Sequence, residues 1–166
     1  MKQYLYPIVL LLCLCSCVPS HQEFGARLAA ASPMNLNQYA EFMDIKKKAD
    51  NGDKAAQLFM EGARQHSIKQ AFPFIQQAAE QNLSLAQAIV GGCYIQGVAV
   101  PKDIDKGVMW TKKAADQGEI NAEATLGIIY YVGVGVPRDR NVAKMWFEKA
   151  AAQGEPTAKR LLKTYY

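Results

Sequence analysis

The residue types best suited to catalysis or metal binding are few in this chain, and their spacing matches no catalytic motif. The histidines, His21 and His66, lack a metal-spaced partner, and neither HExxH nor CxxC occurs. The stretch DIDKG at 103–107 lacks the third acidic position and the bidentate glutamate of a calcium loop, so Asp103 is predicted to cap a helix. We therefore predict no metal, no cofactor and no enzymatic activity.

Two further patterns carry groups that can bind phosphate or exchange protons. The stretch YVGVGVPRD at 131–139 has glycines at 133 and 135 that could cradle a phosphate, but a third glycine is missing and a predicted helix precedes it. Its alternating valines could instead form a strand, or the segment could connect repeated elements. Glu119 and Glu123 are spaced like paired carboxylates, and we interpret them as a solvated helix face.

The composition is that of a folded domain or a short repeat array. The chain has 166 residues, of which 50% are hydrophobic and 20% charged. A chain of this length buries enough surface to fold without a metal or a disulfide. The net charge of +4 is mild, and basic and acidic residues are interspersed, so we predict no nucleic-acid partner.

The N-terminus has the pattern of an export signal. Lys2 precedes an apolar run over residues 4–14, which is too short to span a bilayer. The following Leu14, Ser16 and Cys17 resemble positions −3, −1 and +1 of the bacterial lipobox, from which Cys15 departs at −2. The resemblance implies cleavage before Cys17 and a lipid on its sulfur. The alternative is an ordinary cleaved signal peptide.

The lipobox resemblance implies an organisation for the first 34 residues. Residues 1–16 are the expected lipoprotein signal peptide, and residues 17–34 the lipidated N-terminus and tether. Cys93 would be the cysteine left unmodified, so no intramolecular disulfide is expected. Val18, rather than aspartate, follows the lipidated cysteine, which in Gram-negative lipoproteins implies an outer-membrane anchor with the domain facing the periplasm.

The remainder of the chain repeats itself at a shift of 36 residues. AADQG at 114–118 recurs as AAAQG at 150–154, and AAEQN stands at 78–82. The same shift aligns Trp110 with Trp146 and maps YVGVGVPRD onto IQGVAVPKD at 95–103. The repetition therefore favours a connector between repeated elements over a strand or a phosphate loop.

The segments between the connectors have helical patterns. Apolar and small residues recur with the period of an α-helix over 104–117, and the segment 120–131 is apolar on more than one side. Gly118 and Gly154 are placed to terminate helices, and Pro156 suits a first helical turn. These patterns predict an all-α protein.

The repeated residues resemble the Sel1-like repeat, an α/α hairpin related to the tetratricopeptide repeat. In the more complete copy the matching residues are Leu126, Gly127, Tyr130, Gly133, Gly135, Val136, Asp139, Ala143, Trp146, Phe147, Lys149, Ala150, Ala151, Gln153 and Gly154. The preceding copy departs from the pattern at Ala99, Gly107 and Thr111. The resemblance implies a right-handed α/α solenoid of about four hairpins.

The repeat boundaries follow from this resemblance. A degenerate tetratricopeptide-like helix pair is expected over 35–67 and Sel1-like repeats over 68–166, with the best copies at 86–121 and 122–158.

The resemblance also implies protein binding, with the first helix of each pair lining a concave face. Flexible methionines beside charged residues could hold a peptide or a partner helix there. The alternative is that these methionines pack in the core. The candidate partner-binding residues are Met109, Lys112, Lys113, Met145, Glu148 and Lys149, and the equivalent upstream positions are Pro73, Gln76 and Gln77.

We therefore expect a lipid-anchored scaffold or adaptor that binds a protein partner in the periplasm. Two alternatives remain open at this point. One is an immunity protein that neutralises a periplasmic toxin, and the other, of a different class, is a hydrolase acting on the cell wall.

Overall fold

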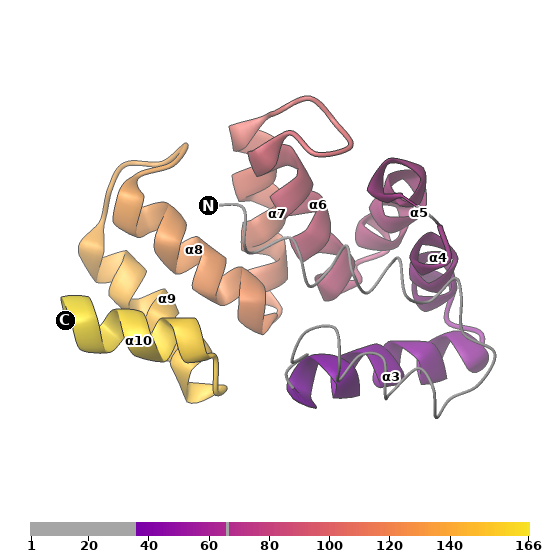
Figure 1. The fold of residues 1–166 in the computed structure, drawn as a ribbon, viewed down its shortest axis with the longest axis horizontal. Coiled ribbons are helices and arrows are strands. Elements are labelled where there is room, and N and C mark those ends of the chain that lie inside the picture. Colours follow the sequence, from indigo (N-terminus) through magenta and orange to yellow (C-terminus); the bar gives the residue numbers. More distant parts are fainter. Residues whose placement is uncertain (1–35, 66) are drawn as a thin grey trace. The chain divides into compact units, whose positions relative to one another are not determined.

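The computed structural model describes residues 36–65 and 67–166 (Figure 1). In that part of the chain every regular element is an α-helix, which confirms the all-α prediction. The chain divides into two compact units, with the boundary between Leu83 and Ser84. The predicted signal peptide, the lipid attachment site Cys17, the tether, and both histidines lie outside the described residues.

The unit that ends at Leu83 contains three described helices: α3 (Leu36–Asp50), α4 (Lys54–Ala63) and α5 (Ile68–Glu80). Helix α3 packs against α4, and α4 packs against α5. Asp53 caps α4 by accepting a hydrogen bond from the Ala56 amide at 2.8 Å, and Ser67 caps α5. Capping satisfies amides that have no partner within a helix, so these two residues determine where α4 and α5 begin.

The second unit contains five helices: α6 (Ser84–Gln96), α7 (Ile104–Asp116), α8 (Ile120–Val132), α9 (Arg140–Ala152) and α10 (Pro156–Tyr165). Each of these helices packs against the next one along the chain. The helices predicted over 104–117 and 120–131 differ from α7 and α8 by one residue at their C-terminal ends. Such agreement is expected because caps and glycines mark these boundaries locally.

The two long connectors of this unit have the same conformation 36 residues apart. Asp103 accepts from the Lys106 amide at 3.0 Å, and Asp139 accepts from the Val142 amide at 3.0 Å, which confirms helix capping by Asp103. Gly135 has a φ of 68°, and Ala99 adopts the same left-handed conformation with a φ of 67°. The segment YVGVGVPRD therefore links α8 to α9 and forms neither a strand nor the strand-to-helix turn of a dinucleotide site.

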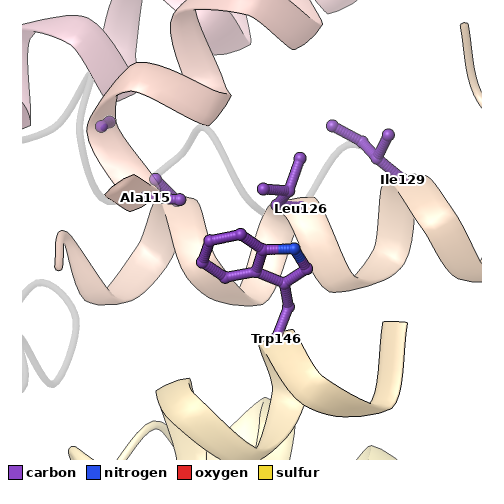
Figure 2. Close-up of a cluster of buried hydrophobic side chains, with 6 residues drawn as sticks. Ala115, Leu126, Ile129 and Trp146 are labelled. Atoms are coloured by element: carbon purple, nitrogen blue, oxygen red, sulfur yellow. The ribbon is translucent and has the colours of Figure 1, made fainter. Parts of the chain in front are cut away.

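Helix α9 is buried on two sides, because it contacts both earlier and later helices of its unit. Trp146 packs with Ala115 of α7 and with Leu126 and Ile129 of α8 (Figure 2). The next residue, Phe147, belongs to a second cluster, which includes Ala158 of α10. Consecutive helical residues point about 100° apart, so neighbouring aromatic residues fill the two separate interfaces of one helix.

Candidate functional site

Six predicted partner-binding residues lie on α7 and α9, at matching positions of the two helices. Within each helix they are spaced three and four residues apart, which places them on one side of the helix. We call this set the methionine–lysine face; it consists of Met109, Lys112, Lys113, Met145, Glu148 and Lys149.

The two methionines of this face lie at the surface. Met109 is 44% exposed and Met145 is 43% exposed, whereas Trp146, the residue next to Met145, is 6% exposed. The sequence left open whether these methionines pack in the core, and the structure shows that they do not. Exposure of the same side chain at equivalent positions of two repeats makes this face a candidate contact surface.

The two helices share buried residues of one hydrophobic cluster, although each packs against α8. Trp146 of α9 packs against Ala114 and Ala115 of α7. Beyond the helix ends, Gln153 Nε2 donates to the Gly118 carbonyl at 3.4 Å. The small alanine side chains leave space for the indole ring, so the cluster links α7 to α9.

A tryptophan beneath each lysine orients it. Lys113 Nζ lies 4.5 Å from the centroid of the Trp110 ring, and Lys149 Nζ lies 4.2 Å from that of Trp146. An ammonium group over an indole face is attracted by the electrons of the ring. Each lysine therefore lies along its helix and covers apolar surface while its charge remains in contact with solvent.

Other charges on α7 and α9 are neutralised within the same helix. Lys112 pairs with Asp116 at 2.9 Å, and this hydrogen-bonded carboxylate raises the pKa of Lys112. Glu148 pairs more loosely with Lys144, at 3.8 Å. Because exposed pairs four residues apart contribute little to stability, both are free to exchange partners at low cost.

The upstream equivalents of these residues belong to the other unit. Pro73 and Gln77 are exposed on α5, and Gln76 donates a hydrogen bond to Glu80 at 3.1 Å. They are not part of the methionine–lysine face. Pro73 lies inside α5, where it removes one helical hydrogen bond.

The prediction that Glu119 and Glu123 form a solvated helix face is wrong, since both are buried, at 5% and 4% exposure. Glu119 caps α8 by accepting hydrogen bonds from the Asn121 and Ala122 amides, and burial raises its pKa. Glu123 accepts from Gln153 Nε2 at 2.8 Å, and burial raises its pKa as well. The two carboxylates therefore belong to the packing between helices.

The Glu123 contact has an uncharged counterpart one repeat earlier. Gln117 Nε2 donates to Gln87 Oε1 at 2.7 Å, and both pairs are 30 residues apart in the sequence. The donors stand at the C-terminal caps of α7 and α9. The 36-residue shift aligns Gln117 with Gln153 in the sequence. This alignment is the signal from which a repeated contact of the two glutamines can be predicted.

We expect Glu123→Gln to stabilise the protein at neutral pH, because glutamine removes a buried negative charge. The gain should be only about 0.5 kcal/mol, because the Gln153 amide and Lys149 already offset part of the cost of burying that charge. The raised pKa means that the Glu123 carboxyl binds a proton more readily in the folded protein than in the unfolded chain. The stability that this protonation gives to wild type is complete below the ordinary pKa of glutamate. It is lost as pH rises through the pKa of Glu123 in the folded protein. Thermal unfolding at pH 7.5 and pH 4 measures the effect.

The expected advantage of the variant disappears at the lower pH. The matched reverse change, Gln87→Glu, should lower stability at neutral pH and recover it in acid. An equal difference between Glu123→Gln and wild type at both pH values would contradict the role assigned to burial.

The fold and the repeated contacts define an α/α repeat protein. The family model of the Sel1 repeat matches residues 54–83, 84–119 and 120–155, and the chain belongs to this family. The matches pair α4 with α5, α6 with α7, and α8 with α9. Sel1 repeats generally mediate protein–protein interactions, and such scaffolds are typically non-enzymatic.

Solved structures show the same relationship. A Sel1 repeat protein from Oxalobacter formigenes is 38% identical, with a TM-score of 0.64 over 75% of this chain and 98% of that one. A protective antigen of uropathogenic Escherichia coli with an SLR fold is 34% identical, with a TM-score of 0.58 over 71% of this chain and 27% of that one. Cysteine-rich protein B of Helicobacter pylori, at 23% identity and a TM-score of 0.58, shares the fold over 79% of this chain and all of that one. No curated protein matches the chain in sequence.

Membrane-spanning helices and clusters of metal ligands are both absent from the described residues. None of the helices α3–α10 is both long and apolar enough to cross a bilayer. Within residues 36–65 and 67–166, no group of three or more histidine, cysteine or acidic side chains is arranged to hold a metal ion.

Proposed function

We propose that this protein is a lipid-anchored scaffold or adaptor that binds a protein partner in the periplasm through the methionine–lysine face. The observation that carries the proposal is the exposure of Met109 and Met145 at equivalent positions of α7 and α9. Membership of the Sel1 repeat family supports a protein as the partner.

The chemistry of the face suits recognition of a peptide or a helix. Methionine side chains are unbranched and polarisable, so they adapt to partners of different shape. The lysines around them supply charge at the edge of the apolar contact, where it contributes to specificity and association rate. The buried Trp146 of α9 belongs to one cluster with Ala114 and Ala115 of α7, which links the two helices that carry the methionines.

We expect Met109→Asp combined with Met145→Asp to abolish partner capture while leaving the fold intact. A carboxylate at each position would be desolvated in the complex, whereas in the free protein it remains in water and costs little. The measurement is a pull-down from detergent-solubilised membranes, with thermal unfolding in parallel. Val132→Asp is the matched control, because Val132 is 60% exposed on α8, outside the face.

Two results would contradict this proposal. Capture that survives both substitutions would show that the partner binds elsewhere. A large loss of thermal stability would show that the methionines contribute to folding despite their exposure.

The proposed location rests on the lipobox resemblance of Leu14, Ser16 and Cys17, and on Val18 after it. Anchoring by more than one acyl chain is stable, whereas a single chain gives marginal binding. We expect Cys17→Ser to release the protein from the membrane fraction or to leave it uncleaved. Equal amounts of wild type and variant in the outer-membrane fraction would rule out lipid anchoring.

A further inference from the structure

Two lysines of the methionine–lysine face differ from the other lysines of the same helices. Three lysines on α7 and α9 pair with a carboxylate of their own segment: Lys106 with Asp103, Lys112 with Asp116, and Lys144 with Glu148. In the part of the chain that the structure describes, no ion pair is formed by Lys113 or Lys149. Their positive charges are therefore available to a partner.

Both available charges occupy the same position relative to an exposed methionine. Lys113 follows Met109 by four residues, and Lys149 follows Met145 by four, so each pair lies on one side of its helix. The indole beneath each lysine limits its rotamers before any partner arrives. This restriction lowers the entropy that binding would otherwise cost.

Within residues 36–65 and 67–166, neither of these two lysines has a carboxylate within ion-pair distance. The position equivalent to Glu123 one repeat earlier is the uncharged Gln87, which accepts from Gln117. Lys149 has an electrostatic interaction with Glu123, but that carboxylate is buried and accepts a hydrogen bond from Gln153. Carboxylates of a partner can therefore pair with both lysines without breaking an internal ion pair.

The position of the two pairs on different helices constrains the partner further. One pair lies on α7 and the other on α9, and buried residues of both helices belong to one cluster. An α-helix rises about 10 Å over seven residues, which brings equivalent side chains back to one face. A partner helix with apolar residues at this interval therefore presents one apolar face, which is the chemistry that two exposed methionines on separate helices require.

We propose that the partner segment is an acidic amphipathic helix, whose apolar side chains contact Met109 and Met145 and whose carboxylates pair with Lys113 and Lys149. This inference rests on the proposed function, since it specifies the class of partner for the same face.

The probe is a fluorescein-labelled synthetic helix of about five turns, with leucines seven residues apart and glutamates placed beside each leucine. A second peptide carries glutamine at every glutamate position. We expect the acidic peptide to bind the wild-type protein about tenfold more tightly by fluorescence anisotropy, and this preference to shrink as salt is raised.

Two double variants with equal net charge test which lysines matter. Lys113→Gln with Lys149→Gln should remove the preference for the acidic peptide. Lys159→Gln with Lys163→Gln removes two charges from α10, outside the face, and should leave the preference unchanged. Lys113→Arg with Lys149→Arg retains both charge and stacking and should preserve binding, which separates a lost charge from a disturbed fold.

The inference is wrong if both peptides bind equally, if neither binds, or if the α10 variant loses the preference as fully as the variant of the face. Failure of the proposed function is recognised separately. If membrane-derived partner is still captured in a methionine-dependent way while the acidic peptide shows no preference, the proposed function stands and the acidic class is excluded.

Discussion

Gly91→Ala is expected to destabilise the protein by about 2–3 kcal/mol, although alanine is the better helix former. A Cβ atom added at Gly91 would lie 2.5 Å from Thr111 Oγ1, 2.9 Å from the Thr111 backbone nitrogen and 3.0 Å from the Gly107 carbonyl oxygen. Two of these atoms belong to the backbone of α7, so they cannot move aside without separating α6 from α7. Equilibrium urea unfolding measures the change.

The neighbouring glycine provides the matched control for this substitution. A Cβ atom at Gly92 meets nothing within 4 Å, so Gly92→Ala should stabilise the protein by about 0.5–1 kcal/mol through helix propensity alone. Both variants place the same methyl group in the same helix, one residue apart. Equal effects of the two substitutions would show that close packing of α6 on α7 is not what selects Gly91.

Trp146→Ala is expected to cost about 3–5 kcal/mol, which is the range for removing a large buried aromatic side chain. The ring fills the space between α7, α8 and α9, where it packs with Ala115, Leu126 and Ile129 (Figure 2). Alanine side chains on α7 cannot extend to fill the cavity. The loss should appear as a lower midpoint of urea unfolding, with unfolding starting in the last repeats because each repeat contacts its neighbours.

The equivalent tryptophan one repeat earlier is the comparison for this prediction. Trp110 is only half-buried, so Trp110→Ala should cost about 1–2 kcal/mol, including the contact with Lys113. An equal loss of unfolding free energy for Trp146→Ala and Trp110→Ala would contradict the prediction. It would mean that the position of Trp146 between helices contributes no more than a half-buried ring does.

Much of the fold could be predicted from the sequence because its determinants are local and occur twice. Asp103 and Asp139 cap helices through amides two or three residues away, and Gly133 ends α8 in the left-handed conformation. Each of these signals recurs 36 residues away, which separates a structural requirement from coincidence. Ala99 shows the limit of residue type, since the backbone of the connector is preserved there without a glycine.

The candidate site could be predicted only in part. The sequence placed Met109 and Met145 on one side of their helices, but both α7 and α9 also bury other apolar residues. Helical periodicity therefore could not determine which apolar side faces solvent. The sequence wrongly predicted Glu119 and Glu123 to be solvated for a related reason. Glu123 contacts Gln153, a residue 30 positions away, and the sequence of one helix does not show such a contact.

The sequence by itself determined the all-α fold class, the ends of the helices, the connector between them and the Sel1 repeat family. These properties depend on neighbouring residues and on repetition. Tertiary structure alone decided which methionines are exposed, which lysines form no ion pair within the described part of the chain, and which glutamates are buried. Those properties arise where α7, α8 and α9 pack together, and the sequence of one helix does not specify which of its sides the next helix will cover.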